Sequence, residues 1–258
     1  LLFGGPPVLT DMIQYFVVAQ DLAATPNVGI SSGTFAATPS SVALTSAAFP
    51  ISGSVNSYTI VSAGLLGTVS VGAAQAYHSL TEAGAFGLFN AINTNGLSSN
   101  LVVEIVDAGI PETGAIALNA INYNGCAAEP YQVYIKPFTG VTTALTGNSA
   151  TAHIKLSGAD NVIIDGSNNG SSSKNMTITN TNTASSGNAV LWLASASSTD
   201  GATNNTIKNC IINGNSDITT LMGIFSGGTA SISTTGNALT DNPANTIQNN
   251  TISKSQYG

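Results

Sequence analysis

The sequence predicts an all-β fold: a right-handed parallel β-helix (solenoid) with an N-terminal capping helix, preceded by part of a β-sandwich domain. The main observation is a recurring phrase that opens with Asn, continues with β-branched residues and closes with Asp or Asn at a turn. Its copies begin at residues 161, 205 and 245, so the starts lie 44 and then 40 residues apart. A strand-and-turn unit that recurs at tens of residues is typical of a solenoid, in which no unit buries its apolar face alone.

The composition indicates a folded chain that carries little charge. Of 258 residues, 43% are apolar and 7% are charged, the net charge is −7, and there is no arginine. This apolar content favours a buried core. The scarcity of basic residues argues against nucleic acid as a partner. The absence of arginine argues against binding of acidic polysaccharides. No run of about 18 apolar residues is present, so no membrane insertion is predicted.

Residues 1–57 are predicted to form the C-terminal part of a β-sandwich domain. The β-prone segments are 15–22, 41–45 and, just beyond the boundary, 58–61, with stretches rich in Gly, Ser, Thr and Pro between them. Three strands cannot close a sandwich, so we expect this region to be the end of a domain that is cut at its N-terminal side.

One helix is predicted, at the start of the solenoid. The segment Ser79-Leu80-Thr81-Glu82 has the sequence of a capping box. The apolar residues that follow at helical spacing are Ala85, Leu88, Phe89 and Ile92. Gly96 is the expected stop. A short amphipathic helix at this place would cover the apolar interior of the first rung.

Residues 58–258 are assigned to the parallel β-helix, truncated at its C-terminal end. The predicted strands are short and have no helices between them, as expected for the sides of a coil. They are 101–106, 132–136, 153–156, 162–164, 176–179, 189–193, 206–208, 211–212, 222–225 and the repeat at 245. The connections before the repeats lengthen along the chain, so the loops 194–204 and 226–244 are predicted to project from one corner as a contact surface.

Asparagine and cysteine are expected to serve the structure. From residue 161 onward there are 17 asparagines, many of them where a strand ends. Asn tolerates left-handed backbone at turns, and stacked Asn side chains can bond from rung to rung; direct ligand contact is the alternative. Cys126 and Cys210 lie 84 residues apart without zinc-site spacing. Cys210 is expected to be buried, and the pair is either bridged or two separate thiols.

Residues 77–258 resemble the right-handed parallel β-helix modules of large secreted bacterial surface proteins, adhesin-like and of the Bacteroidetes type. The matching phrases are 77–83, 89–93, 135–137, 158–166 and 204–210. Residues 15–60 resemble the tail of an Ig-like repeat that precedes such modules. The resemblance implies an extracellular or cell-surface location and export by type IX secretion. As partners it implies other copies or domains of the same surface protein, and surface glycans.

Pectate lyases, pectin esterases and polygalacturonases also resemble this chain in the opening helix and stacked rungs. The first two chemistries depend on arginine, which is missing here. The third needs clustered Asp, and the one close pair is Asp160 and Asp165. Their odd separation favours opposite faces of a strand, and both occupy turn positions; weak Ca²⁺ binding is the other interpretation.

The remaining candidate residues receive structural interpretations. His78 and His153 are predicted to lie at the cap or the surface, without a role as base or ligand. Trp192 is predicted to pack in the core, with an exposed sugar-stacking platform as the alternative.

The predicted function is therefore a non-catalytic extracellular module, a stalk, adhesin or filament segment. We predict no catalytic, metal-binding or cofactor-binding residue and no cofactor. The alternatives are a polysaccharide-binding or polysaccharide-degrading β-helix domain and a self-assembling fibre subunit.

Overall fold

The computed structural model describes residue 8 and residues 10–60, 63–124, 130–183, 187–234 and 242–258. The chain divides into two compact units, Leu1–Ser62 and Ala63–Gly258. The sequence boundary at residue 57 would divide a strand that pairs inside the first unit. In the described residues no helix has the length and apolar character needed to cross a membrane.

The first unit contains two separate antiparallel pairs of strands. They are β1 (Met12–Tyr15) with β4 (Asn56–Thr59), and β2 (Val18–Gln20) with β3 (Val28–Ile30). The predicted strand 15–22 is thus broken between two sheets. The predicted strand 41–45 is wrong, because the Val42 N–H bonds the side-chain oxygen of Gln20 at 2.8 Å in place of a neighbouring strand. The β-sandwich remains a prediction for this unit.

The second unit is a parallel β-solenoid with three sheets, and from β6 onward successive strands of the chain pass from one sheet to the next. The first sheet contains β5 (Leu65–Val71), β6 (Leu97–Ile105), β9 (Val133–Pro137), β12 (Val162–Asp165), β15 (Thr206–Lys208) and β18 (Thr246–Gln248). The second contains β7 (Gly109–Pro111), β10 (Thr143–Gly147), β13 (Met176–Asn180), β16 (Cys210–Asn213) and β19 (Thr251–Ser253). The third contains β8 (Leu118–Asn119), β11 (Ala152–Ser157), β14 (Ala189–Ala194) and β17 (Met222–Ser226).

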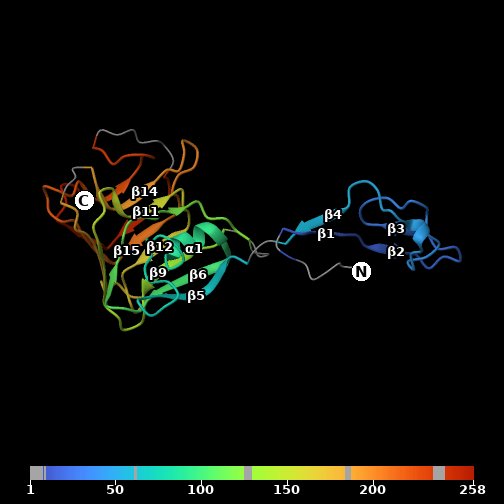
Figure 1. Ribbon diagram of the computed structural model, residues 1–258, viewed down its shortest axis with the longest axis horizontal. Coiled ribbons are helices and arrows are strands. Elements are labelled where there is room, and N and C mark those ends of the chain that lie inside the picture. The colour runs from blue at the N-terminus through green and yellow to red at the C-terminus, as the bar shows by residue number, and fades with distance from the viewer. Residues whose placement is uncertain (1–7, 9, 61–62, 125–129, 184–186, 235–241) are drawn as a thin grey trace. The chain divides into compact units, whose positions relative to one another are not determined.

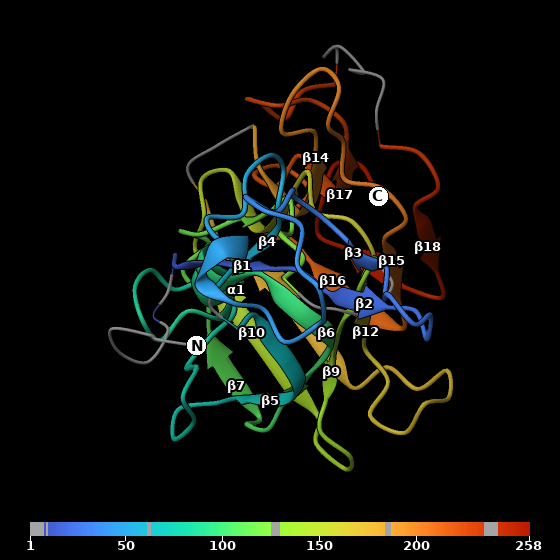
Figure 2. The ribbon, with the colours of Figure 1, turned by 90° about the vertical axis from the view of Figure 1, so that its right-hand side faces the viewer.

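The figures show this coil from two directions. In Figure 1 the colour of the second unit runs from the green-blue first strands to the red C-terminal strands. In Figure 2, β7 and β10 of the second sheet lie at the lower left, β12, β15 and β18 of the first sheet on the right, and β14 and β17 of the third sheet at the top.

The interior of the coil consists of apolar side chains stacked in register. In the first sheet Val103, Ile135, Ile164 and Ile207 occupy one column, and all four are buried. Neighbouring strands lie about 4.8 Å apart, so each rung covers the apolar side chains of the one before it. The same core holds Cys210, which is buried as predicted and is a free thiol, and burial raises its pKa to about 12. Cys126 lies outside the described residues.

The helix α1 (Leu88–Asn95) begins later than predicted, with Gly87 at its N-cap. Ser79 Oγ does accept the Glu82 N–H at 3.1 Å, but the segment around it is not helical. The reason is Gly84, whose left-handed φ of 85° interrupts a right-handed helix that would begin at Ser79. The N–H groups of Leu80 and Thr81 donate to the Glu112 carboxylate, each at 2.8 Å. These bonds attach the segment before α1 to the residue that follows β7 (Gly109–Pro111).

The predicted stop and the capping role of α1 are both present. Gly96 ends the helix with a φ of 69°, and its N–H bonds the Ile92 carbonyl at 2.7 Å. The helix buries Leu88, Phe89 and Ile92 and contacts β5 and β8, the first strands of two sheets. It therefore covers the opening rung of the coil.

Candidate functional site

The recurring phrase is in register, but its first copy begins one residue later than the sequence alignment placed it. Ile164, Ile207 and Ile247 are register partners, so the first spacing is 43 residues and not 44. The left-handed turns agree with this register: Asn161, directly before β12, and Asn204, two residues before β15, lie 43 residues apart and have φ of 59° and 55°.

Inward-facing asparagines connect each rung to the one before it. Asn205 Oδ1 accepts the Val162 N–H at 2.8 Å, and its Nδ2 donates to the Ala159 carbonyl at 2.9 Å. Asn245 repeats the arrangement one rung later, with Asn205 N–H and the Ala202 carbonyl, both at 2.8 Å. These asparagines therefore serve the structure, as predicted.

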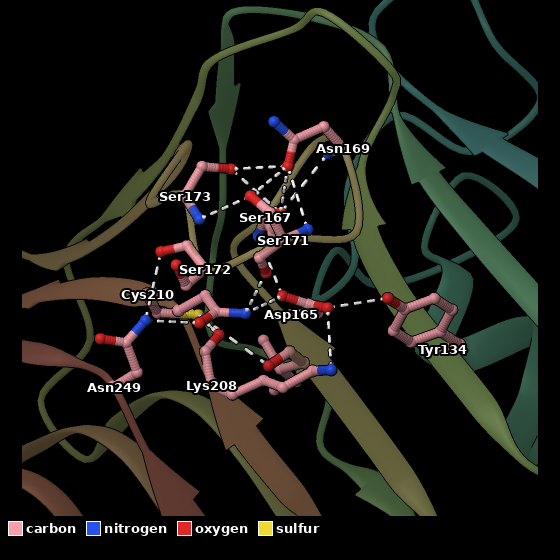
Figure 3. A network of polar contacts seen from close by, with 12 residues as sticks. Tyr134, Asp165, Ser167, Asn169, Ser171, Ser172, Ser173, Lys208, Cys210 and Asn249 are labelled. Atoms are coloured by element: carbon pink, nitrogen blue, oxygen red, sulfur yellow. Dashed lines mark hydrogen bonds and ion pairs between the residues drawn. The ribbon is translucent and has the colours of Figure 1, made fainter.

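A second column of side chains lies at the other end of these strands, between the first and second sheets (Figure 3). Asn249 Nδ2 donates to Asn209 Oδ1, and Asn209 Nδ2 donates to Asp165 Oδ1, each at 2.7 Å. Asn209 and Asn249 have left-handed φ values of 57° and 51°. We call Asp165, Asn209 and Asn249 the axial column, because its bonds cross successive rungs.

A column of alternating charge on the first sheet escaped the sequence reading. Glu104 is the register partner of Lys136, and Asp165 is the register partner of Lys208. Lys136 and Asp165 follow Ile135 and Ile164, the last residues that β9 and β12 pair with each other. Lys136 lies 2.9 Å from Glu104, and Lys208 lies 3.1 Å from Asp165. Opposite charges on adjacent strands stabilise the observed pairing of the strands, whereas like charges placed directly opposite each other would destabilise it. Alignment of the predicted strands would have revealed the column.

Asp165 is a buried carboxylate with several hydrogen-bond donors around it. Besides Lys208 and Asn209, it accepts Tyr134 Oη–H at 2.8 Å and the Ser167 N–H at 3.0 Å. Burial alone would raise its pKa, but the hydrogen bonds outweigh that effect and hold the pKa below its usual range. Burial and Asp165 raise the pKa of Tyr134 to about 12. Asp165 is thus a fixed anion with a structural set of donors.

Asp160 and Asp165 do not form a working pair, because they bond different groups at the two ends of β12. Asp160 accepts the N–H and the hydroxyl of Thr203 at 2.6 and 2.7 Å. It also borders an open cavity of about 480 Å³ beside Asp200, together with loop residues of the same corner. The other lining residues are Ser198, Thr199, Gly201, Thr203 and Pro243. Within the described ranges, no group of three or more His, Cys, Asp and Glu side chains could hold a metal ion.

The loop after β17 partly folds back onto the third sheet. Trp192 is 2% exposed, and its indole N–H donates to the Gly227 carbonyl at 2.7 Å. The Lys155 ammonium lies 4.0 Å from the Trp192 ring, and Phe225 and Ile232 pack into the same cluster. The prediction that Trp192 is packed is confirmed, although it lies outside the coil beneath a loop. The predicted projection of 226–244 is wrong for this covering segment, and residues 235–241 lie outside the described ranges.

The two histidines differ in position. His78 lies at the cap as predicted, stacked on Phe86 with ring centroids 4.2 Å apart. His153 is fully buried, which contradicts the predicted cap or surface position. Its register position lies opposite Val190, and at this corner both His153 and Ile154 face inward, so the strand alternation is interrupted. Burial lowers its pKa to about 4.

Glu112, which no motif indicated, is the other buried carboxylate of note. Besides the two backbone N–H groups it accepts the Thr81 hydroxyl. Burial raises its pKa, and the hydrogen bonds only partly offset that shift. It anchors the segment that leads into α1.

The sequence and structure were compared with protein families, curated proteins and solved structures. No family model, curated protein or solved structure matches the chain.

Proposed function

We propose that this chain is a non-catalytic structural module of a secreted surface protein, a stalk or adhesin segment whose work is mechanical. The observation that carries the proposal is the axial column. Its amides and its carboxylate bond one another across successive rungs, and the inward asparagines bond the backbone of adjacent rungs. An enzyme would direct such polar groups at a substrate. In this chain they instead form hydrogen bonds between adjacent rungs.

The geometry suits a stiff rod. Three parallel sheets supply backbone hydrogen bonds along the axis, and a continuous apolar core resists separation of the rungs. A chain with 7% charged residues and many neutral polar side chains suits a surface exposed outside the cell. The extracellular location and the export route are parts of the proposal that rest on the resemblance.

An assay for polysaccharide cleavage tests the non-catalytic part. The purified chain is incubated with neutral and acidic polysaccharides, and new reducing ends and unsaturated products are measured. We expect no turnover. Cleavage that the substitution Asp160→Asn or Asp165→Asn abolishes would overturn the proposal.

A second candidate, glycan binding without cleavage, is favoured by the cavity at the projecting corner. Asp160 and Asp200 face it with two threonines and a serine, and carboxylates and hydroxyls are the groups that pair with sugar hydroxyls. A glycan array on the chain tests this candidate, with Asp200→Asn as the variant and the exposed Asp217→Asn as the control. Binding that Asp200→Asn weakens and Asp217→Asn leaves unchanged supports it; equal binding by all three chains opposes it.

A further inference from the structure

The loop between β12 and β13 arranges an unusual set of donors around one side-chain oxygen. Asn169 Oδ1 accepts the N–H and the hydroxyl of Ser171 at 3.0 and 2.6 Å. It also accepts the hydroxyls of Ser167 at 3.0 Å and Ser173 at 3.1 Å. Figure 3 shows these donors converging on Asn169, while its amide nitrogen points away from them. We call the three serines the donor cradle.

The donor cradle surrounds the side-chain amide of Asn169, and the backbone nitrogen of Gly170 is the next nucleophile along the chain. The bond from the Ser171 N–H folds the Asn169 side chain back over the Gly170 peptide. Gly170 has a φ of +73°, and no heavy atom beyond its two chain neighbours lies within 4 Å of the place where a Cβ would be. Asn169 and Gly170 are both exposed. The Asn169-Gly170 pair is therefore open to water and to solvent base.

Two other Asn-Gly pairs in the described chain lack this arrangement. The Gly96 N–H bonds the Ile92 carbonyl at 2.7 Å, and the Gly214 N–H bonds the Ser253 carbonyl at 3.0 Å. Both nitrogens are engaged in regular backbone hydrogen bonds. Among the described residues, the Gly170 N–H has no such partner.

We propose that Asn169-Gly170 is a self-modification site at which the chain deamidates by intramolecular attack. The Gly170 nitrogen loses its proton to solvent base and forms a bond to Cγ, and negative charge develops on Oδ1. The donor cradle stabilises that charge, since its donors already point at the oxygen. The bond from Cγ to the amide nitrogen then breaks, and ammonia leaves with a proton from water.

Hydrolysis completes the change without an oxidant or a reductant. Water adds to either carbonyl of the five-membered imide and one carbon–nitrogen bond breaks. The product is aspartate or isoaspartate at position 169. An aspartate carboxylate keeps the serine donors in charge-assisted bonds, and the module gains one negative charge at the exposed side of the corner that holds the axial column.

Peptide mapping by mass spectrometry tests the proposal. The folded chain and the chain unfolded in urea are incubated in mildly alkaline buffer, and deamidation at Asn95, Asn169 and Asn213 is followed with time. We expect the three to react at similar rates when unfolded. In the folded chain, Asn169 should react about tenfold or more faster than the other two, and faster than in urea. A lower rate at Asn169 in the folded chain than in urea would overturn the proposal.

Two variants separate the cradle from simple exposure of the loop. Ser171→Ala removes the hydroxyl nearest Oδ1 and should lower the rate at Asn169 by about tenfold. Ser172→Ala is the matched control. Ser172 bonds the axial column through its backbone carbonyl, which accepts from Asn249 Nδ2, and the substitution leaves that carbonyl in place. Equal rates in the two variants would show that the cradle has no catalytic effect.

Discussion

At the residue scale, the asparagine side chain fits the space between rungs because it both donates and accepts. One inward amide satisfies an N–H and a carbonyl of the adjacent rung, which neither an aliphatic side chain nor a carboxylate can do. The sequence indicated this use of asparagine through its number and placement. It did not indicate which asparagines face inward, since a one-residue error at Asn161 moves the set to the other face.

Asn205→Ala tests the inward ladder. The substitution leaves the Val162 N–H and the Ala159 carbonyl without partners in a buried place, at a cost of about 1–3 kcal/mol for each group. We expect the free energy of unfolding in urea to fall by about 2–4 kcal/mol. Asn215→Ala, in a surface turn, is the control and should change it by less than about 0.5 kcal/mol. Equal effects in the two variants would contradict the ladder.

His153 gives the chain an acid-sensitive stability. Burial lowers its pKa from 6.5 to about 4 in the folded state, so below pH 6.5 the unfolded chain takes up a proton that the folded chain does not. Stability is therefore fully present above pH 6.5 and is lost as pH falls toward 4, by up to about 3 kcal/mol.

Urea midpoints measured between pH 4 and 7.5 test this dependence. His153→Leu should lose most of the change in stability over this range, while His78→Gln should retain it because His78 is not fully buried. Parallel pH profiles for wild type and His153→Leu would show that another group is responsible.

At the element scale, strands with runs of Val, Ile and Leu were predictable, and strands defined by their neighbours were not. β9, β12 and β14 follow from their own residues. β7 contains Gly and Pro, and it is a strand because Ile110 stacks on Leu145 of β10. The start of α1 was missed because the apolar spacing did not reveal the left-handed turn at Gly84, and the partner of the supposed cap, Glu112, lies more than 30 residues away. Local patterns cannot reveal such partners.

Glu112→Gln tests the anchoring of the segment before α1. The neutral amide weakens the bonds to the Leu80 and Thr81 N–H groups and brings its own donors close to theirs. We expect faster hydrogen exchange at residues 79–82 and in α1, and a loss of about 1–3 kcal/mol in stability. Glu82→Gln is the control, since Glu82 is only partly buried. Unchanged exchange in Glu112→Gln would show that the anchor is not needed.

At the scale of the whole molecule, the solenoid could be predicted from the sequence because each rung buries its apolar side chains in the same way. Its function was harder to predict, because the side chains that could take part in catalysis or binding are few and spread along the chain. The structure explains what the carboxylates do: Asp165 completes the axial column, Glu112 holds the cap, and Asp160 fastens a corner loop. Each is committed to a bond between segments that are far apart in sequence, which no sequence window contains.

The most direct test of the mechanical claim is single-molecule force spectroscopy on the second unit, stretched between residues 63 and 258. The variant Asn209→Gly removes the middle of the axial column, and Asn204→Gly, at an equivalent left-handed turn, removes an amide that bonds only its neighbour Thr203. We predict that Asn209→Gly lowers the unfolding force while Asn204→Gly leaves it at the wild-type value. The same force for wild type and both variants would contradict the claim that the column holds the rungs together.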